Sequence, residues 1–402
     1  MSAAVVAAAE PVAERSLEGV AVALFGNTDW YLYNFRLSLI RRLRDEGARL
    51  LLISPAGEYG EKLRAMGFDW RPLPMERRSL NPLAEAKLLL HIAGMMKAER
   101  IAIIHGFTLK PAIYAGIAGR LAGVTGRVSA VAGMGFVFIS DSLKARVLRP
   151  VVRALAWLAF GGPRARLIVQ NPDDRAAFVD TRLVQAHKVH TIPGSGVDLT
   201  RFQVSRRVRA DGEPLKVLLA ARMLWDKGLA EFVEAARVLK AEGRNIRFLL
   251  AGEPDPGNPA ACGPEHLAGW TQEGLVEHLG HVDDMPALLA EVDVVVLPSY
   301  REGLPKTLIE AAGCALPLVT TDVPGCREVV IHEEDGLLVT VREHQGLALA
   351  IGRLDDDADL RRRLGLAARE KALRLFDEQI VLARTLDVYR ELLSAKSPSP
   401  NA

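Results

Sequence analysis

Short apolar runs alternate with segments of helical periodicity along nearly the whole chain. Apolar runs of strand length without polar alternation are typical of parallel strands buried on both faces, and the intervening helices provide that cover. In the first half the pattern predicts strands at Val20–Leu24, Arg49–Ile53, Ile101–Ile104, Val128–Ala132, Arg166–Val169 and Val189–Ile192. It predicts helices at Asn34–Glu46, Pro82–Glu99 and Pro111–Ala122.

The same pattern restarts after a polar segment, Val197–Pro214, which we interpret as a linker. Strands are then predicted at Lys216–Ala220, Arg247–Leu250 and Asp293–Leu297, with a helix at Gly228–Glu242. The predicted fold class is α/β, with two doubly wound parallel sheets. Because ligands of such sheets bind at the carboxyl ends of the strands, residues that follow predicted strands are the candidate site residues.

Length and composition agree with this architecture. A chain of 402 residues suits two domains, and 49% hydrophobic with 25% charged residues is typical of a soluble globular protein. No apolar run reaches the roughly 18 to 20 residues of a membrane-spanning helix. The start, Met1–Ala9, lacks a basic stretch, so we expect a frayed tail and no signal peptide. Cys262, Cys314 and Cys326 lack metal-ligand spacing, and we expect reduced thiols in a cytoplasmic protein.

Basic residues are concentrated in the first half of the chain. Residues 1–205 hold 27 Lys and Arg against 17 Asp and Glu, whereas the remainder holds 24 against 32. Such a surface attracts polyanions, which include membranes, nucleic acids and phosphorylated substrates. No nucleic-acid recognition motif accompanies the basic half, so we expect no nucleic-acid partner.

Two glutamates eight positions apart carry the strongest candidate chemistry. Glu302 follows a predicted strand, and Glu310 lies in a helix predicted to begin near Pro305. The amides of Gly303, Leu304 and the first helical turn can face an anion at the positive helix end. A carboxylate at 310 can accept hydrogen bonds from a ribose diol, and one at 302 can hold sugar hydroxyls. The alternative is that Glu302 caps the helix and Glu310 is an exposed charge.

Arg222 and Lys227 follow the strand predicted at Lys216–Ala220. Arg contacts phosphate oxygens in bidentate fashion and Lys adds a compact charge, so the pair can neutralise a departing diphosphate. The alternative is a surface Arg and a Lys at a helix start, where the helix dipole disfavours a cation. Together with the glutamates, these cations predict a nucleotide-sugar site.

Weaker candidates follow strands in the first half. His105 ends the strand predicted at Ile101–Ile104 and could bond a sugar hydroxyl, although a lone His is more often structural. Gly26-Asn27-Thr28 and Gly133-Met134-Gly135 also follow strands, and either could be a simple tight turn.

Nothing in the sequence requires a metal or another cofactor. Asp355-Asp356-Asp357 lies beside three arginines, and we interpret it as a solvated face. No His and Cys cluster has zinc spacing, and neither a phosphate-binding Gly-x-x-x-x-Gly-Lys loop nor a dinucleotide-binding Gly-x-Gly-x-x-Gly signature is present.

The segment Asp141–Arg166 combines cations with large apolar side chains. Lys144, Arg146, Arg149 and Arg153 are interleaved with valines, leucines, Trp157 and Phe160. A basic amphipathic helix of this kind can lie in a membrane interface. It can equally pack on its own sheet with a basic outer face, and the sequence leaves both open.

Several motifs together resemble one enzyme family. They are Asn34-Phe35-Arg36, His105 to Pro111, Gly133 to Phe138, Gln170-Asn171-Pro172-Asp173-Asp174, Gly194 to Asp198, Pro298 to Glu310 and Pro324 to Glu328. Over about Val20 to Leu393 the chain resembles the retaining glycosyltransferases of family 4, which have the two-domain GT-B fold. It is most similar to their CapM-like and bacillosamine-linked N-acetylgalactosaminyltransferase branch.

The resemblance implies an N-terminal acceptor-binding domain at 1–205 and a nucleotide-sugar-binding domain at 206–375. Residues 376–402 would return a helix, Asp377–Leu393, to the first domain. It implies Arg222 and Lys227 on the diphosphate, Glu302 on the donor sugar, Glu310 on the ribose and His105 near the reacting sugar. Gly303, Leu304, Gly26 and Asn27 are further donor-site candidates, although the usual Gly-rich first loop is reduced to Gly26-Asn27-Thr28.

The expected reaction is metal-independent transfer from a UDP-sugar to a polyprenyl-diphosphate-linked saccharide at the cytoplasmic membrane face. The resemblance suggests same-face substitution, in which the departing phosphate helps to take the acceptor proton. Capsule, O-antigen and protein-glycan assembly all remain open as pathways. The alternatives are a UDP-sugar 2-epimerase of the same architecture and a non-catalytic nucleotide-sugar-binding protein.

Overall fold

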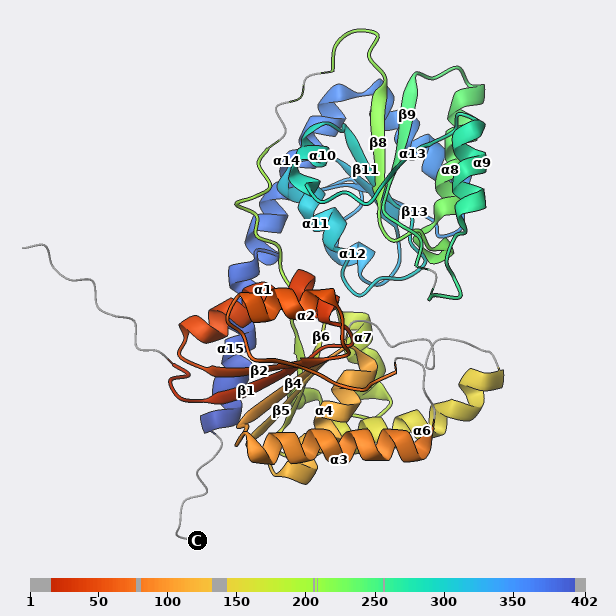
Figure 1. The fold of residues 1–402 in the computed structure, drawn as a ribbon. Coiled ribbons are helices and arrows are strands. Elements are labelled where there is room, and N and C mark those ends of the chain that lie inside the picture. The colour runs from red at the N-terminus through yellow and green to blue at the C-terminus, as the bar shows by residue number, and fades with distance from the viewer. Residues whose placement is uncertain are drawn as a thin grey trace, which may run out of the picture. The chain divides into compact units, whose positions relative to one another are not determined.

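The computed structural model describes residues 16–76, 81–131, 143–204, 207, 209–255 and 257–394. Two parallel α/β sheets organise this part of the chain (Figure 1). The first has seven strands in the order β3-β2-β1-β4-β5-β6-β7, and the second has six in the order β10-β9-β8-β11-β12-β13. In both sheets the chain reverses its direction of growth next to the first strand, which is the doubly wound pattern that the sequence predicts.

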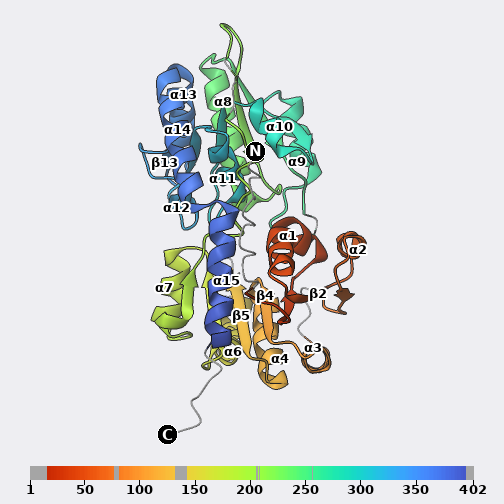
Figure 2. The ribbon, with the colours of Figure 1, turned by 90° about the vertical axis from the view of Figure 1, so that its left-hand side faces the viewer.

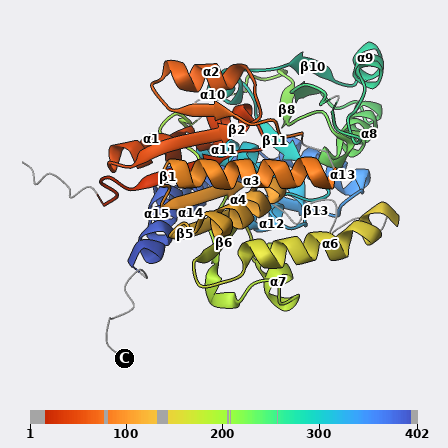
Figure 3. The same cartoon turned by 60° about the horizontal axis from the view of Figure 1, so that its bottom comes forward.

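The predicted elements of the first sheet are present, with small shifts of their ends. Its strands are β1 (Ala21–Phe25), β2 (Arg49–Ser54), β3 (Trp70–Pro72), β4 (Ile103–Phe107), β5 (Gly126–Val131), β6 (Ala165–Val169) and β7 (Val189–Thr191). The helices between them are α1 (Asp29–Asp45), α2 (Glu58–Ala65), α3 (Pro82–Ala98), α4 (Leu109–Ala122), α6 (Leu143–Phe160) and α7 (Pro172–Asp180). A short 3-10 helix, η1 (Ala186–Lys188), precedes β7. Helices α3 and α4 lie side by side, as Figure 3 shows.

The second sheet is built from the same kind of unit. Its strands are β8 (Leu215–Ala220), β9 (Ile246–Ala251), β10 (Glu277–Gly280), β11 (Val294–Leu297), β12 (Leu318–Thr321) and β13 (Leu337–Val339). Its helices are η2 (Trp225–Lys227), α8 (Leu229–Ala241), α9 (Pro264–Gln272), α10 (Met285–Ala290), α11 (Lys306–Gly313), α12 (Cys326–Val329), α13 (His344–Asp356) and α14 (Ala358–Leu375). The last helix, α15 (Glu378–Ser394), follows them in the chain. Helices α13 and α14 run next to each other in Figure 2.

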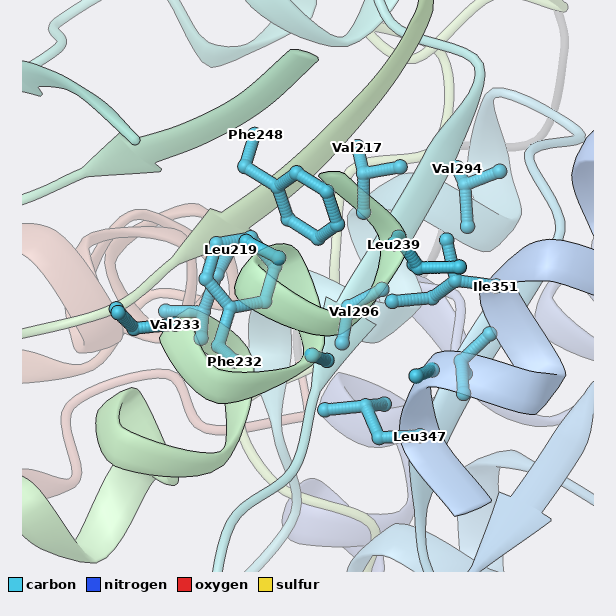
Figure 4. Packing of buried hydrophobic residues seen from close by; sticks show 14 of the residues in the cluster. Val217, Leu219, Phe232, Val233, Leu239, Phe248, Val294, Val296, Leu347 and Ile351 are labelled. Atoms are coloured by element: carbon cyan, nitrogen blue, oxygen red, sulfur yellow. The ribbon is translucent and has the colours of Figure 1, made fainter. Parts of the chain in front are cut away.

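Successive side chains of the central strand β8 enter two separate cores. Val217 and Leu219 pack with α8, α9 and α13, and Figure 4 shows this cluster around Phe232 and Phe248. Leu218 packs on the opposite face with α10, α11 and α14. The sheet is therefore covered on both faces, which explains why its strands lack polar alternation.

Helix starts follow local capping chemistry that the periodicity did not reveal. Helix α1 begins at Asp29, five residues before its predicted start, because the Thr28 hydroxyl accepts a hydrogen bond from the amide of Tyr31. Helices α3 and α7 each begin with an Asn cap followed by Pro, at Asn81 and Asn171.

The predicted linker is only partly a connecting segment. Val197, Leu199 and Phe202 are buried and belong to the core beside α11 and α14. The expectation of a polar linker over the whole of Val197–Pro214 is therefore wrong for its first residues. These three apolar residues are separated by the polar Asp198, Thr200 and Arg201, so the segment reads as polar although its apolar side chains are buried.

The chain divides into two compact units. The first comprises Met1–Ser129, Gly162–Ala165 and Val388–Ala402, and the second comprises Ala130–Gly161 and Arg166–Asp387. The return of the last helix to the first unit is confirmed, since Arg390 donates to the hydroxyl of Ser16 and Leu392 lies against Gly126. The finer boundaries, after residues 205 and 375, stay predictions.

Candidate functional site

In the second unit, the loops that follow β8 and β11 lie against each other. Gly228 has a φ of +75°, and a Cβ there would come within 2.2 Å of the carbonyl oxygen of Pro298. The amide of Tyr300 donates to the carbonyl of Asp226 at 2.9 Å. A glycine at 228 therefore permits a close backbone approach that brings the residues before it next to the Glu302 loop.

Lys227 and Glu302 meet at this junction. The Lys227 Nζ lies 2.5 Å from Glu302 Oε1, and the Ser299 hydroxyl donates to the same oxygen at 2.7 Å. The two charged side chains are 18% and 13% exposed, so water screens the pair only partly. Glu302 does not cap α11, because the capping position is Pro305 and no side chain caps there. The alternative interpretation of Glu302 is therefore wrong.

The loop after β12 supports the backbone of Glu302 from another side. The amide of Glu302 donates to the carbonyl of Pro324 at 3.2 Å. Gly325 has a φ of +83°, and a Cβ there would lie 2.6 Å from the carbonyl oxygen of Glu302. The neighbouring Cys326 is buried, and its burial together with the charge of Glu302 raises the pKa of its thiol to about 12.

Glu310 is a buried carboxyl in α11, so its alternative interpretation as an exposed charge is also wrong. Its burial raises its pKa, while the cations of Lys306, whose Nζ lies 3.4 Å away, and Arg201 act in the opposite direction. A carboxylate at this position has lone pairs that can accept hydrogen bonds from a ligand. Gly303 and Leu304 lead into the same helix, as predicted from the sequence.

Arg222 differs from Lys227 in its surroundings. Its side chain is 53% exposed, and Nη1 lies 2.8 Å from Asp255 Oδ2, on the loop after β9. The two predicted cations thus engage two different carboxylates, and Arg222 is the more accessible of them. The sequence did not identify Asp255 as a partner of Arg222, because it lies in an irregular loop without a recognisable pattern.

His105 lies inside strand β4, which continues to Phe107. The prediction that this strand ends before His105 is wrong, because the hydrogen-bonded register with β1 runs through His105 and Gly106. The ring is buried against Phe107, and its Nδ1 lies 2.8 Å from the hydroxyl of Tyr389. Burial and the cation of Arg36 hold the pKa of His105 well below its usual value, so the imidazole is neutral.

The Tyr389 contact assigns the tautomer of this imidazole. Tyr389 is fully buried, and among the described residues His105 Nδ1 is the acceptor within reach of its hydroxyl proton. If Tyr389 donates to Nδ1, the proton of the neutral ring is on Nε2. Nε2 is buried and has no partner in the described chain. His105 thus presents an unsatisfied N–H donor, which is the kind of group that a ligand oxygen satisfies.

Gly26 and Asn27 form the turn between β1 and α1. The amide of Gly26 donates to the carbonyl of Ile53, and a Cβ at this position would lie 2.7 Å from the side chain of Leu32. Gly26 therefore permits close packing of the turn on its helix. The side-chain oxygen of Asn27 is buried and has no partner in the described residues.

Helix α6 has both buried and exposed apolar side chains, and its contact with a membrane stays a prediction. Ala156, Ala159 and Phe160 are buried, while Val151 and Trp157 are exposed. The cations follow the same division. Arg146 is exposed, Arg149 is half-buried, and the half-buried Arg153 donates to the carbonyl of Thr181 at 3.3 Å. The side chain of Lys144, the first residues from Asp141 and the Gly133-Met134-Gly135 turn lie outside the described residues.

The remaining chemical features give no competing site. In the described ranges no group of three or more His, Cys, Asp and Glu is arranged to hold a metal ion. Asp355 is largely buried in ion pairs with Arg209 and Arg244, and Asp357 caps α14. The interpretation of Asp355–Asp357 as a solvated face is therefore correct for the exposed Asp356 and Asp357 and wrong for Asp355. None of the described helices has the length and apolar character needed to cross a membrane.

Comparisons with known proteins identify the architecture. Residues 21–161 match the family of 4-like glycosyl transferases, and residues 214–357 match the glycosyl transferases of group 1. The chain is 30% identical over 373 residues to the N,N'-diacetylbacillosaminyl-diphospho-undecaprenol α-1,3-N-acetylgalactosaminyltransferase of Campylobacter jejuni. That alignment covers 90% of this chain and 96% of the relative. The chain is a family 4 glycosyltransferase.

Other members of the family and its fold agree. The UDP-Gal:α-D-GlcNAc-diphosphoundecaprenol α-1,3-galactosyltransferase of Escherichia coli is 27% identical over 71% of this chain and 74% of its own length. The crystal structure of HepE of Anabaena in complex with UDP superposes with a TM-score of 0.75 at 20% identity, over 92% of this chain and all of that one. The glycosyltransferase has the GT-B fold and belongs to a retaining family.

Two partners of the predicted site residues had no prediction of their own. Ser299 stands in the quoted Pro298–Glu310 motif, and only the structure gives its hydroxyl a role beside Glu302. Tyr389 lies 284 positions from His105 and has the helical spacing of an ordinary core residue. No local signal in the sequence links those two.

Proposed function

We propose that this glycosyltransferase moves a hexose or N-acetylhexosamine from a UDP-sugar to a polyprenyl-diphosphate-linked saccharide with retention of configuration. The observation that carries the proposal is the contact of Lys227 with Glu302 at the loop junction of the second sheet. The Lys227 ammonium can bind a diphosphate, and the Glu302 carboxylate can bind sugar hydroxyls. The two groups are close enough to contact the same nucleotide-sugar. Both similar transferases act, by their names, on diphospho-undecaprenol-linked acceptors.

Each donor-site residue has a specific role in this proposal. Lys227 and Arg222 bind the diphosphate and neutralise the charge that grows on it as the sugar leaves. Glu302 accepts hydrogen bonds from the sugar hydroxyls, and Glu310 accepts them from the ribose. The amides of Gly303 and Leu304 face the diphosphate at the start of α11. The departing phosphate oxygen accepts the acceptor's proton, so the reaction needs no metal and no separate protein base.

The candidate residues of the first unit have proposed roles of their own. His105 donates from Nε2 to a hydroxyl of the reacting sugar, which would satisfy a buried donor that lacks a partner. Gly26 and Asn27 form a turn at the carboxyl end of β1, where the Asn27 amide oxygen is available to the donor. We propose these residues of the first unit as ligand contacts.

Helix α6 is the proposed contact with an anionic membrane surface. Its exposed apolar residues, Val151, Leu155 and Trp157, share the helix with the cations Arg146, Arg149 and Arg153. Apolar side chains that enter the interface and cations near anionic headgroups act together, with about 1 kcal/mol for each cation. The enzyme would thus work as a peripheral protein at the cytoplasmic face, where a lipid-linked acceptor is available.

The central experiment offers a panel of UDP-sugars with lipid-linked mono- and disaccharide acceptors and determines the anomeric configuration of each product. We expect one donor to be used, with retention. Glu302→Ala and Arg222→Ala should each lower turnover by about 10²-fold or more, because both act on the transition state. Inversion, or near-normal turnover in both variants, would refute the proposal. Conversion of UDP-N-acetylglucosamine without any acceptor would instead indicate an epimerase.

Membrane binding is tested separately by sedimentation with vesicles. Anionic vesicles should bind the enzyme in a salt-sensitive manner, and neutral vesicles or DNA should not. Trp157→Ser should weaken the binding, whereas Leu349→Ser, which removes a 74% exposed leucine from α13, should leave it unchanged. Equal loss in the two variants would show that α6 has no special role.

A further inference from the structure

The N-terminal end of α7 holds the backbone on both sides of Glu302. Asn171 and Asp174 are fully buried polar residues, although α7 itself is otherwise a short surface helix. Both reach residues more than 120 positions away in the chain, on the loop that carries Glu302. The Gln170–Asp174 motif has no role so far in the proposed site, so these long-range contacts need an explanation.

Every hydrogen-bonding group of the Asn171 amide is used. Its Oδ1 accepts from the amide of Asp174 at 2.7 Å, which caps α7. Its Nδ2 donates to Asp174 Oδ2 at 3.0 Å and to the carbonyl of Gly303 at 2.9 Å. The cap fixes the orientation of the amide, because only the oxygen can accept from the helix amide. The two N–H groups must then point at Asp174 and Gly303.

Asp174 holds the residue on the other side of Glu302. Its Oδ1 lies 2.6 Å from Nη2 of Arg301, while its Oδ2 receives the Asn171 amide. A buried carboxylate is stable only when its oxygens are paired in this way. Asp174 therefore needs Arg301 and Asn171 together, and the geometry of all three is interdependent.

Further contacts of the same region limit the movement of the turn. A Cβ at Gly194, which has a φ of +64°, would lie 3.2 Å from the side chain of Leu304. The amide of Glu302 itself is bound by the carbonyl of Pro324. Arg301, Glu302, Gly303 and Leu304 thus each have a neighbour that fixes them. The conformation of this turn is set from outside rather than by its own short sequence.

We propose that Asn171, Asp174 and Arg301 form a clamp that positions Glu302 for the donor sugar. They are positioning residues, since they touch the backbone and neighbour of Glu302 and not the ligand. This inference rests on the proposed role of Glu302 in the transfer reaction. Removal of the clamp lets the turn shift, and a displacement of about 1 Å at a catalytic carboxylate costs on the order of 10²-fold in rate.

The decisive variant is Asn171→Asp, with Asn171→Ser as a milder second form. Both keep an oxygen that can cap α7, and both lose the N–H donor to Gly303. Asn81→Asp is the matched control, because Asn81 likewise caps a helix that begins with Pro, and that helix is α3 of the first unit. Arg301→Lys and Arg301→Gln form a second pair, in which only Lys keeps the charge for Asp174.

Three measurements test the clamp: transfer kinetics, UDP affinity by calorimetry, and hydrogen exchange at the amides of Gly303 and Leu304. We expect kcat to fall by about 10²-fold in both Asn171 variants. UDP affinity should change by no more than about threefold, because Lys227, Arg222 and Glu310 remain in place. Exchange at the two amides should be faster, and Arg301→Lys should keep more of kcat than Arg301→Gln.

A kcat loss no larger than that of Asn81→Asp would overturn the clamp, as would UDP affinity that falls in parallel with kcat. An unchanged exchange rate at the amide of Gly303 would also overturn the clamp. The hydrogen bond from Asn171 Nδ2 to the Gly303 carbonyl would then not restrain the turn. A wild-type enzyme that binds UDP but transfers no sugar would refute the proposed function instead. The exchange measurement would still decide whether Asn171 holds the turn.

Discussion

The Lys227–Glu302 pair gives the sharpest prediction about the candidate site. We consider Lys227→Met, Glu302→Gln and the double variant, which remove one charge, the other, or both. Two unit charges about 4 Å apart attract by about 4 kcal/mol at an effective dielectric constant of about 20, and desolvation offsets part of this. Breaking a fully buried pair costs about 3–5 kcal/mol. With side chains 18% and 13% exposed, we expect about 2–3 kcal/mol for each single variant.

The double variant isolates the interaction from the loss of each side chain. Because the double variant leaves no unpaired charge, its loss in free energy of unfolding should be smaller than the sum of the two single losses by about 1–3 kcal/mol. Urea unfolding followed by intrinsic fluorescence measures all four proteins. The exposed pair Glu234–Arg237 on α8 is the matched control, and exposed pairs of this kind couple by about 0.2–1 kcal/mol. A coupling for Lys227 and Glu302 no larger than that of the control would refute the pairing.

The same cycle has a second outcome in catalysis. Each single variant should lose about 10²-fold or more in turnover, since each removes one charge from the proposed transition-state contacts. The double variant should lose little more than the worse single variant, because residues that act as a unit are not additive. Fully multiplicative losses would contradict a shared role for the two side chains.

The remaining predictions concern Glu310, His105 and Tyr389, which are buried titratable groups. Burial raises the pKa of Glu310 in the folded protein. The free energy of unfolding of the wild type should therefore fall as the pH rises from about 4.5 through the raised pKa. Glu310→Gln lacks this buried charge and should melt at a higher temperature at neutral pH. The same variant should bind UDP more weakly by roughly 1–3 kcal/mol in calorimetry, and an unchanged affinity would remove Glu310 from the site. The pKa of His105 is depressed in the folded protein, so below about pH 6.5 this side chain takes up a proton in the unfolded state but not in the folded one. The free energy of unfolding of the wild type should therefore fall below that pH. It should fall less in His105→Gln. Tyr389→Phe should lower kcat more than it changes the KM for the donor, because the hydroxyl that keeps the proton of His105 on Nε2 would be lost. Equal kinetics in wild type and variant would contradict the tautomer assignment.

Much of the fold could be predicted from the sequence because its signals are local. The buried strands β8 and β11 have continuous apolar runs, and helix α8 has the helical periodicity from which Gly228–Glu242 was predicted. The contact of Lys227 with Glu302 also follows from such signals, since both residues come after parallel strands whose ends share one edge of the sheet.

The rest depends on contacts between distant segments, which periodicity does not encode. The extension of β4 through His105 is set by its register with β1, and the burial of Phe202 is set by α11 and α14. Asn171 has the appearance of an ordinary helix cap, and its second role requires knowledge of where Gly303 lies. Each of these was hidden because the partner lies far along the chain.

The fully buried bond between His105 and Tyr389 has a consequence for synthesis of the protein. Its two ends are separated by 284 residues, and the first unit also includes Val388–Ala402. At about 5–20 residues per second, a ribosome needs roughly 15–60 s to pass from one end of this bond to the other. During that interval the nascent first unit lacks this helix, so its completion must wait until α15 has been synthesised.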